Sequence, residues 1–198
     1  AGGHGKVVAD AAHATGQWGE IVFFDDSFPE RKTHSEWSIT GSMEGFPNEA
    51  DLFDAAVVAI GDNRKRLALT QDLLELDINI VSIIHPSAIV SPLAEVQRGS
   101  VICAGAIVNI DASVGVACIV NTNAVVEHDC ELEEGVHVSP QAGVAGEVTI
   151  GSCSWIGIGA VVRHQITIGS NVIIGAGSVV VDNIPSGITA VGNPARKF

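Results

Sequence analysis

Aliphatic residues recur at every sixth position through the second half of this chain. From Ile84 to Val180, seventeen consecutive positions in this register hold Ile, Val or Leu, with no insertion. A second register, four residues further on, holds mostly small residues such as Ala88, Ala106 and Ala124. A period of six fits neither the 3.6-residue repeat of an α-helix nor the 3.5-residue repeat of a coiled coil. The pattern therefore predicts a series of short strands, each supplied by one hexapeptide.

Hexapeptide strands of this kind predict a parallel β-helix. Three hexapeptides make one triangular coil, so residues 84–180 supply about five coils. Glycine often follows the aliphatic residue, as at Gly115 and Gly151, and this suits sharp corners. A purely structural β-solenoid would carry the same repeat, so the repeat by itself assigns no function.

The first eighty residues follow a different pattern, in which apolar runs alternate with helical segments. Three apolar runs predict strands, at 21–24, 57–60 and 78–84, and two segments predict helices, at 6–14 and 67–76. Strands that alternate with helices imply a small parallel α/β sheet. The chain is therefore expected to begin with an α/β domain over residues 1–83.

Glycines and acidic residues fall where the carboxyl ends of these strands are expected, the edge at which such sheets bind ligands. The Gly2-Gly3-His4-Gly5 loop would let backbone N–H groups and a helix N-terminus approach a phosphate. Asp25 or Asp26, about twenty residues later, would accept a hydrogen bond from a ribose or base. A tight turn without any ligand is the alternative. Because a loop of this kind normally follows a strand, a first strand is expected before residue 1.

The composition excludes several classes of protein. With 23 acidic and 10 basic residues the net charge is −13, which argues against nucleic-acid binding. A hydrophobic content of 46% with only 17% charged residues excludes intrinsic disorder. No apolar run reaches the roughly 18 residues that span a bilayer, and no signal-peptide pattern is present. The four cysteines have no CxxC or zinc spacing, which favours a reduced, cytoplasmic protein.

The repeat and the C-terminal segment together resemble the hexapeptide-repeat acyltransferases. The segment reads DNIPSG at 182–187 and VGNPAR at 191–196, like the exit from the β-helix in that family. The resemblance implies a left-handed β-helix over 84–181, a tail near coenzyme A over 182–198, and a trimer.

The whole chain is similar to the narrower group of NeuD/PglD-type sugar acetyltransferases. The similarity lies in GGHGKV, FFDD, VAIGDN, IHPSA and NTNAVVEHDC. It is strongest toward the UDP-amino-sugar N-acetyltransferases of the bacillosamine pathway. That resemblance implies transfer of an acetyl group from acetyl-CoA, without a metal, to the 4-amino group of a UDP-4-amino-4,6-dideoxy sugar.

The same resemblance assigns roles to individual residues. His128 matches the catalytic base, Asp129 stands where a carboxylate raises that histidine's basicity, and Asn121 matches a further active-site position. The positions that match acetyl-CoA-binding residues are His137, Ile158 and Ala176. The positions that match the UDP-sugar site are Gly2, Gly3, His4, Asp25, Asp26, Gly61 and Arg64.

The spacing of the histidines bears on how such a site would be built. His128, Gly146 and His164 are one coil apart and so share a corner, where Gly146 leaves space above His128. His137 is only half a coil from His128 and lies on another side of the triangle. A site between adjacent protomers would bring the two together, which favours a homotrimer.

Several alternatives remain at this point. Cys118 and Cys130 fall at small inward positions and indicate packing, so no acyl-enzyme is expected. Zinc-dependent carbonic anhydrases of hexapeptide type need a close histidine pair, which the spacings of His128, His137 and His164 do not supply. An O-acetyltransferase of sialic acid is the runner-up activity. A non-catalytic nucleotide-sugar-binding or assembly module is the alternative outside enzymes.

Overall fold

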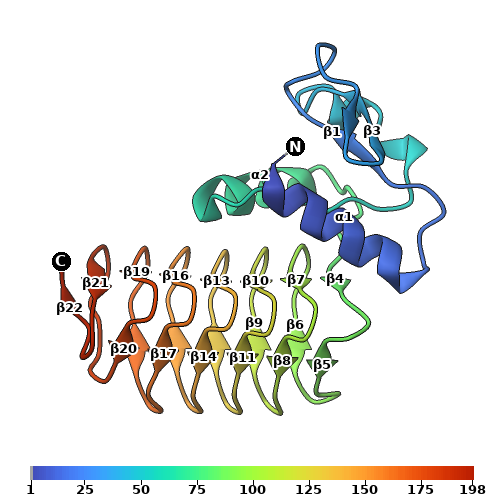
Figure 1. Cartoon of the computed structure of the whole chain (residues 1–198). Helices are drawn as coiled ribbons and strands as arrows, with labels where there is room; N and C mark the ends of the chain where they lie inside the picture. Colours follow the sequence, from blue (N-terminus) through green and yellow to red (C-terminus); the bar gives the residue numbers. More distant parts are fainter. Residues whose placement is uncertain (1) are drawn as a thin grey trace.

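The computed structural model describes residues 2–198 and divides into a small α/β domain and a parallel β-helix. Figure 1 shows the helices of the α/β domain lying along one side of the β-helix. The C-terminal strands lie at the far end of the β-helix from its first coil.

Seventeen two-residue strands build the β-helix and stack into three parallel sheets, here called its first, second and third faces. The first face contains β4 (Ile83–Ile84), β7 (Val101–Ile102), β10 (Ile119–Val120), β13 (His137–Val138), β16 (Trp155–Ile156) and β19 (Ile173–Ile174), and β21 (Thr189–Val191) and β22 (Arg196–Lys197) extend it. The second face contains β5 (Ile89–Val90), β8 (Ile107–Val108), β11 (Val125–Val126), β14 (Gly143–Val144), β17 (Val161–Val162) and β20 (Val179–Val180). The third face contains β6 (Glu95–Val96), β9 (Ser113–Val114), β12 (Glu131–Leu132), β15 (Thr149–Ile150) and β18 (Thr167–Ile168).

The predicted hexapeptide register is confirmed at every strand, since each aliphatic position from 84 to 180 is the second residue of its strand. Residues pair with the position eighteen further on, as in Ile119 with His137. The aliphatic side chains point inward, and Ile102, Val120 and Ile156 are fully buried. Ile84 is 39% exposed, because the first coil has no coil before it to cover its end.

The corners of the β-helix repeat with the same period of six. One residue at each corner has a positive φ between 55° and 73°, a conformation that Gly, Asn and Asp tolerate best. These residues are Gly99, Gly105, Asp111, Ala117, Asn123, Asp129, Gly135, Gln141, Glu147, Cys153, Gly159, Gln165, Asn171 and Gly177. The backbone thus presents an equivalent carbonyl or side chain at the same corner of each successive coil.

The α/β domain differs from the expected parallel sheet. It contains α1 (Gly3–Thr15), β1 (Val22–Phe24), β2 (Thr33–His34), β3 (Trp37–Gly41), the 3₁₀ helices η1 (Phe46–Asn48) and η2 (Ala50–Leu52), and α2 (Asn63–Glu75). Its sheet has the order β1-β3-β2, with β1 parallel and β2 antiparallel to β3.

Of the three expected strands, the one at 57–60 is therefore wrong, and the one at 78–84 is wrong in extent. The run at 57–60 forms no ladder, and the run at 78–84 gives only an isolated bridge between Ala56 and Ile80 and the strand β4. The apolar residues at 57–60 pack into the core without pairing. The hydrophobic pattern of the sequence cannot distinguish such a segment from a buried strand. The strand expected before residue 1 lies outside the described residues. Neither helix in the described part of the chain is long and apolar enough to cross a membrane.

Candidate active site

His128 and Asp129 form a hydrogen-bonded pair at the corner between the second and third faces. His128 Nδ1 lies 2.7 Å from Asp129 Oδ2, and the two side chains are 51% and 55% exposed. Both residues belong to the same corner, at which Asp129 is the residue with positive φ. The hydrogen bond that His128 donates to Asp129 is the main cause that raises the pKa of His128, and the charges of Glu127 and Glu147 add to it. The corner therefore holds a histidine that is more basic than usual.

Gly146 determines how the His128 ring lies. A Cβ atom at this position would stand 2.6 Å from both Cε1 and Nε2 of His128. The sequence predicts open space above His128, but the imidazole itself fills the space that Gly146 leaves. A side chain at this position would therefore collide with the ring.

A second group of polar side chains lies on the first face. Asn121 Nδ2 donates to His137 Nε2 at 3.0 Å, and the His137 ring stacks on Trp155 with centroids 5.5 Å apart. His137 is only 9% exposed. Burial, with smaller effects from Arg66 and His4, lowers the pKa of His137 to about 3.

His4, at the start of α1, is close enough to this group to affect it electrostatically. Burial, with a smaller effect of Arg66, lowers its pKa to about 4. Within residues 2–198, His4 Nε2 and His137 Nδ1 are the buried side-chain nitrogens without a hydrogen-bond partner. Both imidazoles are therefore neutral near pH 7, and each has a buried nitrogen without a hydrogen-bond partner.

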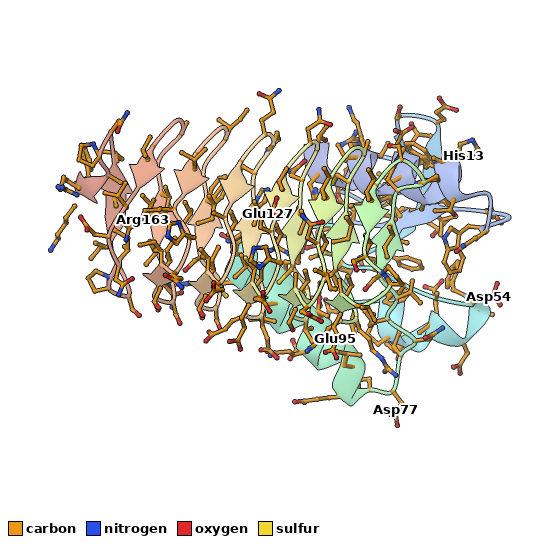
Figure 2. The ribbon with its side chains drawn as sticks, turned by 90° about the horizontal axis from the view of Figure 1, so that it is seen from below. His13, Asp54, Asp77, Glu95, Glu127 and Arg163 are labelled. Atoms are coloured by element: carbon orange, nitrogen blue, oxygen red, sulfur yellow. The ribbon has the colours of Figure 1, made fainter. Side chains whose placement is uncertain are left out.

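These two groups lie on opposite sides of one β-helix. His128 stands at the corner between the second and third faces, and that corner is opposite the first face, which carries His137. Figure 2 views the molecule from the side away from the helices, where the labelled Glu127 and Arg163 mark this corner. The separation predicted from the nine-residue spacing is thus present, and one protomer does not bring His128 to His137.

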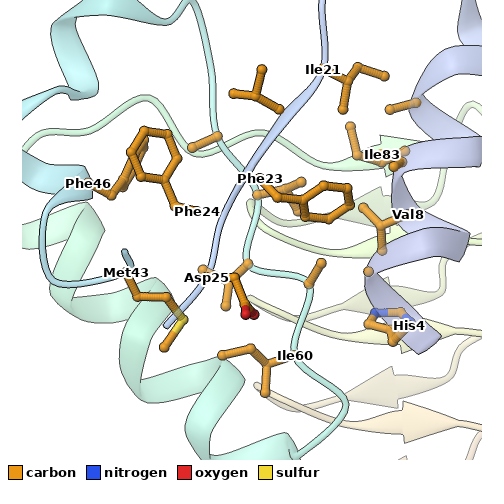
Figure 3. Close-up of a pocket in the computed structure, with 18 of the residues that line it drawn as sticks. His4, Val8, Ile21, Phe23, Phe24, Asp25, Met43, Phe46, Ile60 and Ile83 are labelled. Atoms are coloured by element: carbon orange, nitrogen blue, oxygen red, sulfur yellow. The ribbon is translucent and has the colours of Figure 1, made fainter. Parts of the chain in front are cut away.

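Most residues expected to bind the nucleotide sugar meet at a cavity of about 610 Å³ in the α/β domain. Gly2, Gly3, His4, Asp25 and Gly61 line it together. Figure 3 shows the labelled His4 and Asp25 beside an apolar wall of Phe23, Phe24, Phe46 and Ile60. The cavity therefore has a polar end formed by the glycine loops and a large apolar body.

Asp26 and Arg64 do not join the other expected residues at this cavity. Asp26 Oδ1 accepts from the Met43 backbone at 3.2 Å, and Arg64 Nε donates to Asn171 Oδ1 on the β-helix at 2.8 Å. Lys65, the neighbour of Arg64 on α2, lines the cavity instead. Nothing in the sequence distinguished Lys65 from Arg64, because the direction of each side chain depends on how α2 docks.

The residues expected at the coenzyme follow one edge of the β-helix. Ile158 and Ala176 lie one coil apart at the corner between the first and second faces, and both are exposed. His137 lies on the first face, one coil before Trp155. Around them is an exposed group of large apolar residues, here called the apolar strip: Trp155, Ile158, Val161 and Ile173.

Three of the four cysteines, Cys103, Cys118 and Cys130, are buried. Cys118 and Cys130 are buried, as predicted for packing residues, and burial raises the pKa of Cys118 to about 12. Burial likewise raises the pKa of Cys103 to about 11. In the described part of the chain, no three His, Cys, Asp or Glu side chains gather as metal ligands.

Comparisons with known proteins match this architecture along the whole chain. The PglD N-terminal domain family matches residues 1–73, and the bacterial transferase hexapeptide family, a model of six repeats, matches 147–182. The acetyltransferase domain of PglB from Neisseria gonorrhoeae FA1090 is 44% identical, with a TM-score of 0.96 over 100% of this chain and 96% of that one. The same domain in complex with acetyl coenzyme A is 41% identical, with a TM-score of 0.93 over 100% and 95%.

The chain belongs to the PglD-type hexapeptide-repeat acetyltransferases. A mutant of perosamine N-acetyltransferase from Caulobacter crescentus, in complex with CoA and GDP-perosamine, is 35% identical, with a TM-score of 0.93 over 100% of this chain and 93% of that one. UDP-N-acetylbacillosamine N-acetyltransferase of Bacillus subtilis (strain 168) is 40% identical over 105 residues, which are 52% of this chain and 48% of that relative. The chain thus spans about half of this curated relative. The predicted fold class, an α/β domain followed by a left-handed parallel β-helix, is confirmed.

In this PglD-type protein, Gly146→Ala is expected to lower kcat/KM at least about tenfold, because the new Cβ displaces the His128 ring from Asp129. The matched control is Gly143→Ala in the same coil, where a Cβ would meet only Val161 Cγ1 at 3.8 Å. Steady-state kinetics of both variants, with melting temperatures, test this. Equal activity of the two variants would contradict the close packing of the ring on Gly146.

The buried His137 predicts a specific acid sensitivity of this PglD-type fold. Its pKa is about 3 in the folded chain and about 6.5 when unfolded, so below pH 6.5 protons bind preferentially to the unfolded state. Stability is therefore lost as the pH falls, by about 1.4 kcal/mol per pH unit from this residue. When the pH falls from 6 to 4.5, the free energy of unfolding measured in urea should decrease by about 2 kcal/mol less in His137→Gln than in the wild type. Parallel pH dependences of the two proteins would contradict a neutral, buried His137.

Proposed function

We propose that this chain is an acetyl-CoA-dependent N-acetyltransferase that acts on the 4-amino group of a UDP-4-amino-4,6-dideoxy-N-acetylhexosamine. The observation that carries the proposal is the His128–Asp129 pair on an exposed corner, 2.7 Å apart. Relatives support it, since the PglB domain binds acetyl coenzyme A and perosamine N-acetyltransferase binds CoA with a nucleotide amino sugar. The bacillosamine relative, which this chain matches over 48% of its length, supports the UDP sugar.

His128 is proposed as the general base. Asp129 accepts the hydrogen bond from Nδ1, so Nε2 is the nitrogen that takes a proton from the sugar amine. The amine nitrogen attacks the thioester carbonyl of acetyl-CoA, the N–C bond forms, and the C–S bond breaks. The proton returns from Nε2 to the leaving thiolate, so that the products are the amide and CoA. No covalent acyl-enzyme is needed.

The complete site is proposed to lie between protomers of a homotrimer. One protomer supplies His128, and its neighbour supplies Asn121, His137 and the nucleotide-sugar cavity. The exposed apolar strip supports this arrangement, because exposed apolar side chains that gather on one edge mark a surface that binds a ligand or a partner. Ile158 and Ala176 on that edge are proposed to contact the coenzyme. The four cysteines are free, which accords with the proposed cytoplasmic location.

The direct test is release of free CoA thiol from acetyl-CoA, with the UDP-amino sugar and a sialic acid as parallel acceptors. Turnover with the UDP-amino sugar, and acetylation of its 4-amino group by mass spectrometry and NMR, is the expected result. Turnover with the sialic acid alone would move the activity to O-acetylation. Ligand binding without turnover on either acceptor would assign a binding module.

A further inference from the structure

Arg66, at the start of α2, is fully buried, and all of its partners are neutral oxygens. Its five N–H groups donate to four backbone carbonyls and one side-chain amide. Within residues 2–198 it forms no salt bridge. A buried charge normally has a counter-ion, so this guanidinium is unusual.

Two arms of the guanidinium bind the β-helix. Nε donates to Ala117 O at 2.7 Å, and Nη2 donates to Gly135 O at 2.9 Å. These residues lie one coil apart at the corner between the third and first faces, and both have positive φ. Asn63 continues the row, since its Oδ1 accepts from Arg66 Nη2 and its Nδ2 donates to Cys153 O at 3.1 Å. Arg66 and Asn63 thus bind corner carbonyls of three successive coils.

The third arm binds the polar end of the cavity in the α/β domain. Nη1 donates to Ile60 O at 3.0 Å and to Gly61 O at 3.3 Å. Gly61 lines the cavity together with Gly2 and Gly3. One side chain therefore fixes this loop against the β-helix.

Within residues 2–198, no carboxylate forms an ion pair with the Arg66 guanidinium. Burial lowers its pKa to about 10, so it stays protonated near pH 7. Its field reaches the same end of the cavity, because it contributes to the lowered pKa of His4. The charge of the Asp62 carboxylate raises the pKa of Arg66. Asp62 itself caps α2 by accepting a hydrogen bond from Lys65 N at 2.9 Å.

We propose that Arg66 is a positioning residue for a nucleoside diphosphate: it fixes the Ile60–Gly61 loop on the β-helix and supplies a positive charge to the bound diphosphate. The inference rests on the proposed function, which places the nucleotide sugar in this cavity. A charge effect of this kind acts on the phosphates and not on the nucleoside. UDP and uridine therefore separate it from a general loss of structure.

The test is calorimetric titration of the full chain with UDP and with uridine. Arg66→Gln, which keeps a donor but removes the charge, should weaken UDP binding about tenfold and leave uridine binding within about twofold. Arg66→Lys should preserve the ratio of the two affinities, because it keeps the charge. Arg98→Gln removes the same charge from an exposed site in the first coil and should change neither the UDP affinity nor the uridine affinity. An unchanged UDP-to-uridine ratio in Arg66→Gln would overturn the inference.

A measurement on the wild type covers the case in which Arg66→Gln does not fold. The ¹⁵N–¹H resonance of Arg66 Nε should shift when UDP binds and stay in place with uridine. Equal responses to UDP and uridine, or none to UDP, would contradict the inference. If the wild type binds no UDP at all, the proposed function itself fails, and the two failures are thereby distinguished.

Discussion

Replacing His128 with alanine is expected to lower kcat/KM by about 10²–10⁴, the usual contribution of a general base. The physical reason is that the pair with Asp129 raises the pKa of His128 and occupies Nδ1, which leaves Nε2 to take the proton in the proposed mechanism. The fold should persist, since the His128 side chain is 51% exposed and its loss leaves no buried cavity. The measurement is CoA release with the UDP-amino sugar, alongside the melting temperature.

His164→Ala is the matched control for His128→Ala. It removes an exposed imidazole from the same corner, two coils further along the β-helix. This variant should keep its activity within about twofold, as surface substitutions away from a site do. Comparable losses in both variants, or a full rate in His128→Ala, would show that His128 is not the base.

Mixed trimers are expected to regain activity that neither parent variant has. If His128 of one protomer acts on a substrate held by its neighbour, His128→Ala and Asn121→Ala each inactivate a different half of the site. In a cyclic trimer that contains both variants, about one third of the sites then combine an intact His128 with an intact Asn121. Co-expression with two affinity tags, followed by purification through both tags, would give the mixed species for the assay.

The alternative predicts a different result from the same mixture. A site within one protomer would contain one substitution in every copy, and mixing would restore nothing. The controls are trimers of each parent alone, carrying both tags. Activity near that of the parents, in a sample with a proven mixed composition, would contradict the shared site.

The β-helix could be predicted from the sequence because its cause is local and repeats. Each hexapeptide carries its own inward aliphatic residue and its own corner, so the period of six identifies the strands, the corners and the stacking of His128 on Gly146. Asp129 illustrates this well, because a residue that tolerates positive φ stands at the predicted corner and also reaches the neighbouring imidazole.

The α/β domain was less predictable because its contacts depend on tertiary packing. The β2–β3 hairpin is short and polar, and no periodicity marks it. The apolar run at 57–60 predicts a strand, but these residues pack into the core without pairing. The direction of Arg64 toward Asn171 depends on how α2 lies on the β-helix.

Arg66 shows a contact that one sequence cannot reveal. Its carbonyl partners Ala117 and Gly135 lie 51 and 69 residues away, and a backbone acceptor carries no residue-type signal. Only the folded corner brings these oxygens into a row that α2 can bind. The cavity in the α/β domain is likewise a product of packing, although the glycine loops at its polar end are visible in the sequence.

The pH dependence of kcat/KM tests most directly whether neutral His128, supported by Asp129, is the base. Because Asp129 raises the pKa of His128, the wild type should lose activity as the pH falls through a value above 6.5. Asp129→Asn removes the largest cause of that shift, so the acid limb should move to lower pH while the plateau rate falls. Both proteins are assayed with the same substrate, so the titration of the substrate amine contributes equally to the two pH profiles and cancels in their comparison. An acid limb at the same pH in both proteins would contradict the account.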